Sequence, residues 1–434
     1  MVWRGLLFGP GQAAHAPLAR TTHRHRTIVR ENTARSAVGP AQPELVVPNT
    51  KLASVQDSAT PDPFPWPPQS ATGVGSMPGT DPLGAMRLIL DELPDLPYLA
   101  ELPDRGVGAD MIGRTAGLLI DLPVEATTRG WRLADRPGRD VRRAQSLLAR
   151  DLDALEEAAD GYQGTLKLQV CGPWTMAASL ELARSQEPVL GDPGAVRDLT
   201  ESLAEGVAAH VAGVAARVPG ARLLLQVDEP SLPAVLAGGV PSASGFNRVR
   251  EVEEADAEAG LRAVLSATAA PTLVHCCGMS APVGIIRGAG ADGAGIDLGV
   301  LRRGEEEVLA EAVEAGLGIF VGAVPAAPVT AAPAPAPAGR PRADGPAADA
   351  TSPQRNGSGT LPDARSTADR VVELWRRMGW PAARVPGAAG VAAQVVITPG
   401  CSLAGAPPEY ARAALACCRD AARMLPELIE EEAP

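Results

Sequence analysis

Three consecutive residues, His275, Cys276 and Cys277, follow a short apolar stretch that is typical of a buried strand. The chain has only 5 His and 6 Cys in 434 residues, so three adjacent soft ligands are unusual here. Side chains alternate along a strand, which predicts that His275 and Cys277 share one face and that Cys276 points to the other. Imidazole nitrogen and thiolate sulfur are ligands that Zn²⁺ prefers. The triplet therefore indicates either half of a zinc site or a buried histidine beside two structural thiols.

Further ligands for such a site must come from other strands. Asp297 ends the apolar run GAGID, and Cys401 follows the run VVITPG. A catalytic zinc site usually has protein ligands plus one open or exchangeable position. If all the strands end at one rim, Asp297 and Cys401 can meet His275 and Cys277 there. Cys171, which also ends an apolar run, is either a substitute ligand or a packing thiol.

Two other stretches carry groups suited to an amino acid. Asp228 and Glu229 close the run LLLQV, and adjacent carboxylates on a strand point to opposite sides. One of them can bind a substrate ammonium while the other holds a loop, although a plain helix cap for Asp228 is an alternative. In ATGVGSMPG, the glycines permit a tight turn, and Ser76 with nearby backbone N–H groups suits a carboxylate or a phosphate.

The elements that position these residues form a regular alternation. Short runs that are apolar throughout are separated by Ala/Leu-rich stretches with helical spacing, which predicts a parallel sheet covered on both faces. Eight such runs suit a closed (β/α)8 TIM barrel. An open doubly wound sheet is the alternative, but no GxGxxG follows any run. The runs are 71–76, 97–102, 165–170, 221–227, 272–276, 293–298, 317–323 and 394–400.

Two low-complexity segments flank and interrupt the predicted barrel. Residues 1–65 lack apolar periodicity and are expected to form a disordered leader. Residues 325–366 are rich in Pro and Ala, then in Gly and Ser, which predicts a solvated loop insertion. The expected catalytic domain is therefore a single barrel over residues 66–434, interrupted by this insertion.

Composition limits the partners. The net charge of −12 argues against a nucleic-acid surface and a basic membrane-binding face. No apolar run approaches the ~20 residues of a transmembrane helix. The six cysteines all follow residue 170 and do not form a disulfide framework in a chain of this length. Reduced thiols and a cytoplasmic location are the prediction.

In chain order, several of these pieces resemble the catalytic barrel of cobalamin-independent methionine synthases, in a short, single-barrel form. The similarity covers about residues 70–325 and 367–420. Any one piece is weak, but the ordered set is fairly specific. The pieces are GVGSMPGTDP (73–82), CGPWTMAASL (171–180), QVDEPSL (226–232), VHCCG (274–278), GID (295–297) and TPGCSL (398–403).

The resemblance implies a zinc-dependent methyltransferase that transfers a methyl group to the thiol of homocysteine and forms methionine. The implied zinc ligands are His275, Cys277, Asp297 and Cys401, with Asp297 replacing the family's Glu. The implied homocysteine site consists of Val74, Gly75, Ser76 and Asp228, with a further acid at Glu101 or Asp104. No catalytic residue is implied beyond the metal site, and the methyl donor is either a methylfolate or a methyl-corrinoid protein.

The sequence also departs from the family in ways that leave alternatives open. The family's second Glu after DEP falls on Ala234, its Trp falls on Ser179, and no His follows His275. These missing residues affect the binding of the methyl donor and the delivery of a proton more than they affect the zinc ligands. Another zinc-dependent thiol alkyltransferase and a non-catalytic amino-acid- or zinc-binding barrel are therefore the alternative functions.

Overall fold

The computed structural model describes residues 64–328, 363–379 and 388–432. All of these described residues belong to one compact unit. Nearly all of the predicted leader and most of the predicted insertion lie outside the described residues. No helix among the described residues is both long and apolar enough to span a bilayer.

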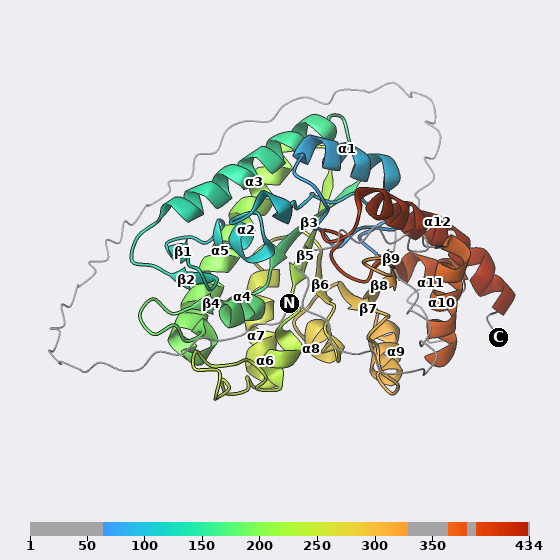
Figure 1. The fold of residues 1–434 in the computed structure, drawn as a ribbon. Helices are drawn as coiled ribbons and strands as arrows, with labels where there is room; N and C mark the ends of the chain where they lie inside the picture. The colour runs from blue at the N-terminus through green and yellow to red at the C-terminus, as the bar shows by residue number, and fades with distance from the viewer. Residues whose placement is uncertain (1–63, 329–362, 380–387, 433–434) are drawn as a thin grey trace, which may run out of the picture. The chain divides into compact units, whose positions relative to one another are not determined.

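A six-stranded parallel sheet forms the centre of this unit (Figure 1). It has the order β3-β5-β6-β7-β8-β9, so each strand pairs with the next strand of this sheet in chain order. Six of the eight predicted runs correspond to these strands. They are β3 (Thr165–Cys171), β5 (Arg222–Asp228), β6 (Thr272–Cys276), β7 (Gly293–Asp297), β8 (Gly318–Val324) and β9 (Val395–Pro399).

The other two predicted runs, 71–76 and 97–102, do not form regular strands. They make isolated parallel bridges, in which Ala71 pairs with Ile397 of β9 and Tyr98 pairs with Lys167 of β3. A third bridge joins Ser76 to Glu101. Closely spaced glycines in the first run and Pro97, which has no N–H, account for the lack of a continuous ladder. The sheet is thus curled, with both edge strands bonded to these two segments.

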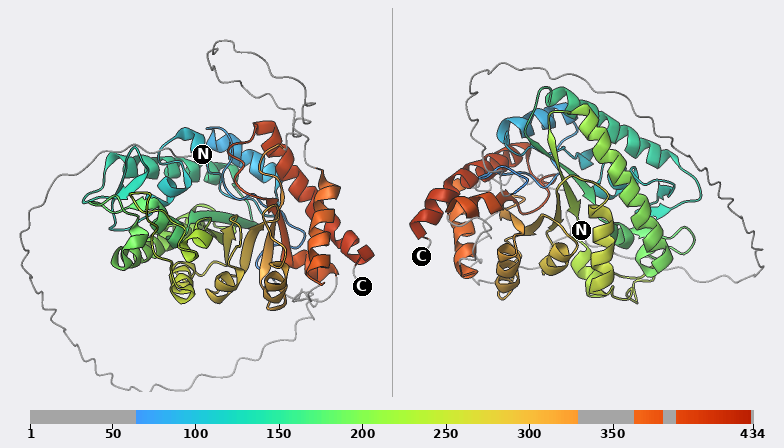
Figure 2. Two further views of the ribbon diagram at one scale, coloured as in Figure 1. Left: turned by 60° about the horizontal axis from the view of Figure 1, so that its bottom comes forward. Right: turned by 180° about the vertical axis from the view of Figure 1, so that it is seen from behind.

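Helices cover the outer face of the sheet, as Figures 1 and 2 show. Neighbours in this layer include α1 with α3 and α12, α5 with α7, and α8 with both α7 and α9. The longer helices are α1 (Pro82–Glu92), α3 (Arg139–Ala158), α5 (Pro193–Arg217), α7 (Glu254–Leu265), α9 (Glu306–Glu314), α10 (Ala364–Arg377) and α12 (Pro408–Glu432). The short ones are α2 (Met111–Ala116), α4 (Pro173–Ser179), α6 (Leu232–Leu236), α8 (Val283–Gly288) and α11 (Ala388–Gln394), with 3-10 turns η1 (Pro103–Arg105) and η2 (Val189–Gly191).

Local sequence explains where several helices begin. α1 and α5 each start with Pro at the first helical position, where a missing N–H is harmless. The preceding residues, Asp81 and Asp192, accept hydrogen bonds from the first free backbone N–H groups. A small sheet that the sequence analysis did not predict, β1 (Val124–Ala126), β2 (Trp131–Leu133) and β4 (Leu180–Glu181), lies beside this layer.

The inner face of the curled sheet is apolar at one end and polar at the other. Leu224 and Leu273, near the starts of β5 and β6, pack with Phe64 and Trp66 in a separate cluster of buried side chains. Phe64, which falls inside the predicted leader, is therefore part of this core. Two residues further along each strand the inner face carries Gln226 and His275, which begin the candidate site.

Candidate active site

Two of the predicted ligands, Cys277 and Cys401, meet at the carboxyl ends of β6 and β9. Their sulfurs lie 3.2 Å apart although 124 residues separate them in the chain. The hydrogen bond between the two sulfurs lowers the pKa of Cys401 and raises that of Cys277. The charge of nearby His275 also lowers the pKa of Cys401. This thiol pair therefore releases its first proton more readily than an isolated cysteine does.

His275 is oriented by Asp228 on the neighbouring strand. Its Nδ1 lies 3.0 Å from Asp228 Oδ1, and both side chains are buried. The other ring nitrogen, Nε2, is buried and has no hydrogen-bond partner within the described part of the chain. A carboxylate that accepts a hydrogen bond from one imidazole nitrogen is a usual partner of a histidine whose other nitrogen binds a metal.

Asp297 approaches the same rim from β7. Its Oδ1 accepts a hydrogen bond of 2.7 Å from the backbone N–H of Gly299. A Cβ placed on Gly400 would lie 2.8 Å from the same oxygen, so the carboxylate rests against the residue that precedes Cys401. Glycine at 400 allows this close approach.

The structure thus places the four candidate ligands at one rim but does not arrange them as a ligand set. Over residues 64–328, 363–379 and 388–432, no three His, Cys, Asp or Glu side chains are grouped as metal ligands. His275 and Asp297 hydrogen-bond to Asp228 and Gly299 instead. Cys276 is fully buried on the opposite face, as strand alternation predicts.

The candidate amino-acid loop lies beside this rim. Ser76 Oγ donates a hydrogen bond of 3.0 Å to Glu101 Oε2. A Cβ on Gly75 would lie 2.9 Å from Gln169 Cγ, so this loop approaches β3 closely. The side-chain amide nitrogen of Gln226 donates a hydrogen bond of 2.7 Å to the carbonyl oxygen of Val74.

The two alternative acids differ in their surroundings. Glu101 is buried, and burial raises its pKa although Arg114, 3.5 Å away, lowers it. Asp104 is exposed and accepts a hydrogen bond from the backbone N–H of Gly79. Of the two, Glu101 is the one joined to Ser76 in the buried part of the rim.

Glu229 has a different role from its neighbour Asp228. Its carboxylate accepts hydrogen bonds from the backbone N–H groups of Trp174 and Thr175 and from the Thr175 hydroxyl. Burial raises its pKa to about 7, against the effect of these hydrogen bonds. Glu229 therefore fixes the start of α4, in agreement with the expectation that one acid of the pair holds a loop.

Three residues that surround the candidate site were not predicted from the sequence. Lys167 and Gln226 bond to each other and to the candidate loop on the inner face of the sheet. Arg114 joins Glu101 to Asp151, and all three are buried. Lys167 and Gln226 interrupt the otherwise apolar runs TLKLQV and LLLQV, which is the signal that identifies them.

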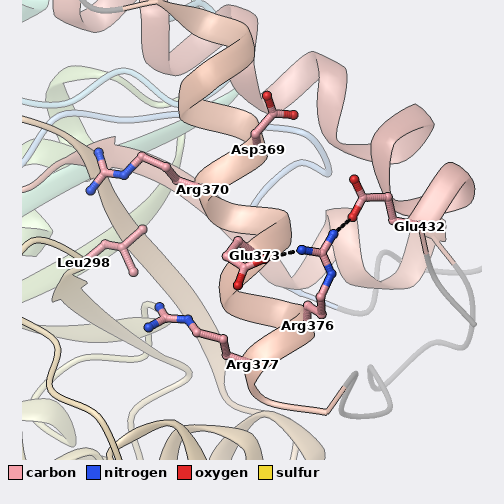
Figure 3. Close-up of a pocket in the computed structure, with 7 residues that line it drawn as sticks. All are labelled: Leu298, Asp369, Arg370, Glu373, Arg376, Arg377 and Glu432. Carbon is pink, nitrogen blue, oxygen red and sulfur yellow. Dashed lines mark hydrogen bonds and ion pairs between the residues drawn. The ribbon is translucent and has the colours of Figure 1, made fainter.

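A cavity of about 450 Å³ lies elsewhere, along α10 (Figure 3). Arg376 pairs with Glu373 and Glu432 across it, and Arg377 pairs with Glu306 of α9. No candidate site residue lines this cavity. Its charges are largely paired, so it carries no evident chemistry.

Comparison with known proteins identifies the class to which this fold and site belong. The sequence profile of the cobalamin-independent synthase catalytic domain matches residues 69–335. This match spans more than half of the chain, and the chain therefore belongs to that family.

A solved structure extends the comparison to the fold. The chain is similar to a B12-independent methionine synthase from Shewanella sp. W3-18-1, solved in complex with selenomethionine. The TM-score is 0.52 at 11% sequence identity, with 84% of this chain and 100% of that chain covered. At this identity the likeness shows a shared fold. No curated protein matches the sequence.

Proposed function

We propose that this protein is a zinc-dependent methyltransferase that converts homocysteine to methionine, with a methylfolate as donor. Membership of the cobalamin-independent synthase family supports methyl transfer to homocysteine. The observation that carries the zinc proposal is the thiol pair of Cys277 and Cys401 near the buried Nε2 of His275, which has no hydrogen-bond partner among the residues that the structure describes.

The donor set fits zinc. Two thiols and one imidazole nitrogen are preferred zinc ligands, and two thiolates neutralise the ion. Asp297 is the proposed fourth ligand, because its carboxylate already rests against the residue before Cys401. Bound there, zinc would lower the pKa of the substrate thiol and supply a thiolate at neutral pH.

The chain's own residues bind and orient the amino acid. The carboxylate of Asp228 is proposed to pair with the substrate ammonium, while its Oδ1 keeps the His275 ring in place. Gly75 and Ser76 are proposed to bind the substrate carboxylate through backbone N–H and hydroxyl groups. Glu101, held by Ser76 and Arg114, is the preferred second acid, and exposed Asp104 is the less favoured one.

The bridges at both sheet edges support a closed (β/α)8 barrel as the finer description of the fold. Backbone hydrogen bonds link Thr72 to Ile397, Glu101 to Gly75, and Leu99 to Lys167, so the two irregular segments occupy the places of the first two strands. We propose one such barrel over residues 66–434, interrupted by a 325–366 insertion and preceded by a leader. The six free cysteines support a cytoplasmic location.

Zinc analysis and a turnover assay test the proposal together. Wild-type protein is expected to carry about one zinc per chain and to form methionine from homocysteine and methyltetrahydrofolate. Methylcobalamin, as the second donor, is expected to give no product. Protein that holds no zinc after zinc-supplemented purification, and forms no methionine with either donor, would overturn the proposal.

A pair of matched variants locates the metal. Cys401→Ser is expected to lose most of the zinc and the activity, since it removes one thiolate ligand. Cys276→Ser changes the buried thiol that directly precedes Cys277 and points to the opposite face of β6, and this variant is expected to keep both. Equal zinc contents in the two variants would show that the metal binds elsewhere.

A further inference from the structure

Lysine is almost absent from this chain. Of its 39 Lys and Arg residues, only Lys51 and Lys167 are lysines. Arginine serves at nearly every other cationic position, including the surface ion pairs. Lys167 is fully buried on β3. A lysine at this one buried site therefore points to a requirement that arginine does not meet.

The contacts of Lys167 explain that requirement. Its Nζ donates to Gln226 Oε1 at 2.8 Å and to the carbonyl oxygen of Val74 at 3.2 Å. It also lies 5.2 Å from the centre of the Tyr98 ring. An ammonium is a compact charge on a thin stem, whereas a guanidinium is a broad planar fork. This narrow space between β3, β5 and the 70–76 segment suits the smaller head.

Lys167 also determines which way the Gln226 amide faces. An ammonium can only donate, so the Gln226 oxygen must face Lys167. The amide nitrogen then faces two acceptors, Asp228 Oδ1 at 2.7 Å and Val74 O at 2.7 Å. If Gln226 rotated by half a turn, its oxygen would oppose the Asp228 carboxylate and the Val74 carbonyl. The cation thus imposes one orientation on a group that would otherwise have two.

The lowered pKa of Lys167 shows that burial of its ammonium group has an electrostatic cost. Burial lowers the pKa of Lys167 to about 8, while the charges of Asp228 and Glu101 raise it. Both direct acceptors of the ammonium are neutral oxygens. Burying an ammonium without a direct carboxylate partner is expensive, so a merely structural core would be better served by an apolar residue.

We propose that Lys167 is a positioning residue for the amino-acid substrate, acting through Gln226 and Val74 to orient Asp228 and the 74–76 loop. This inference rests on the proposed function, because it assigns the substrate site to those two elements. Lys167 donates its hydrogen bonds to Val74 and Gln226 and is proposed to act through them and not by contact with the substrate. Its effect is on how tightly the amino acid is held.

The test compares Lys167→Met with Arg87→Met in zinc-loaded protein. Arg87 lies in an exposed ion pair with Glu157, so its variant removes a cation without affecting the site. Lys167→Met is expected to raise the KM for homocysteine by about tenfold or more and to leave the donor KM and the zinc content unchanged. Arg87→Met is expected to match wild type in all three.

A second variant keeps the test valid if Lys167→Met does not fold. Gln226→Leu removes the link between Lys167 and Asp228 and is expected to raise the homocysteine KM to a similar extent. If both variants fold, their effects are expected to be non-additive in the double variant, because both break the same connection. Strictly additive effects would contradict a connection through Gln226.

The outcomes separate this inference from the proposed function. If wild-type protein neither binds homocysteine nor forms methionine, the proposed function fails. If wild type is active and both Lys167→Met and Gln226→Leu keep its homocysteine KM, only the positioning role fails. A rise in the donor KM or a loss of zinc without a change in the homocysteine KM would also overturn it.

Discussion

The two sides of the candidate site are built differently. On the β3–β5–β6 side, Lys167, Gln226, Asp228 and His275 form an unbroken chain of buried hydrogen-bonded side chains. On the β7–β8–β9 side, glycine allows a close backbone approach instead: a Cβ on Gly322 would lie 2.6 Å from Gly400 Cα and 3.2 Å from Asp297 Cα. Asp297 and Cys401 at that side are partly exposed.

This difference shows how one rim can combine a rigid half, on the β3–β5–β6 side, with an adaptable half, on the β7–β8–β9 side. Side chains that hydrogen-bond to one another within the protein keep their orientation without a ligand, because each hydrogen bond limits the rotation of both of its partners. Glycines let strands approach closely but do not hold a neighbour in place. On the proposed function, the β3–β5–β6 side, which carries Asp228, is preorganised for the amino acid, whereas the partly exposed Asp297 and Cys401 would complete a zinc site after a small rearrangement.

The largest expected effect comes from breaking the rigid half at Asp228. Asp228→Asn removes the charge that faces the proposed ammonium and that orients His275. It is expected to lower kcat/KM for homocysteine by about 100-fold or more, since a partner of a ligating histidine contributes 10–100-fold by itself. Steady-state kinetics measure this change. A loss of less than about threefold would place the ammonium elsewhere.

The next effect distinguishes the two candidate acids. Glu101→Gln is expected to raise the homocysteine KM by about tenfold, because Glu101 is buried and bonded to Ser76. Asp104→Asn is the matched control, and it is expected to change the KM by less than about twofold. The same kinetic assay serves both variants, and the reverse pattern would assign the site to Asp104.

The adaptable half is expected to tolerate a longer ligand. Asp297→Glu extends the carboxylate by one methylene toward the thiol pair. Competition with a chelator is expected to show zinc affinity equal to or up to about tenfold above wild type, whereas Asp297→Ala is expected to weaken it by about tenfold or more. If neither change affects zinc affinity, Asp297 is not a ligand.

Substitution of Glu229 is expected to have the smallest effect on activity, because Glu229 holds the start of α4 and is not one of the proposed substrate or metal ligands. Burial raises its pKa from 4.5 to about 7 in the folded protein, so the folded state binds this proton more tightly than the unfolded state does. This contribution to the free energy of unfolding is full below pH 4.5 and is lost as the pH rises through 7. Urea unfolding between pH 5 and pH 8 is expected to show this decline.

Glu229→Gln provides the control for that decline. It removes the titrating group, so the part of the pH dependence between pH 5 and pH 8 that comes from Glu229 is expected to disappear. The amide cannot accept as many hydrogen bonds as the carboxylate, so α4 is also expected to be less stable above pH 7, where Glu229 is ionised. An unchanged slope would mean that other groups cause the pH dependence.

The sequence predicts the regular part of this fold well, for a physical reason. Strands that are buried on both faces are apolar throughout, and this pattern located β3 as 165–170, one residue short of its observed end. The same reasoning placed regular strands at 71–76 and 97–102, where only isolated bridges form. The sequence shows the glycines and Pro97 that weaken these strands. Whether a strand pairs, however, depends on distant residues that no local pattern reveals.

The candidate site was predictable in type but not in arrangement. Alternation along β6 correctly separated Cys276 from His275, because that rule is local. The contact of Cys277 with Cys401 required the curled sheet, and the role of Gln226 required two neighbouring strands at once. Lys167 was overlooked because a single cation within an apolar run has no periodic signature.

The contact between Asp228 and His275 has a thermodynamic consequence. If Asp228 binds the substrate ammonium and His275 binds zinc, the two occupancies share one carboxylate and are therefore linked. Linkage is reciprocal, so homocysteine must change the affinity for zinc by the same factor by which zinc changes the affinity for homocysteine. Zinc titrations at several homocysteine concentrations, and the reverse, would have to give a single coupling constant.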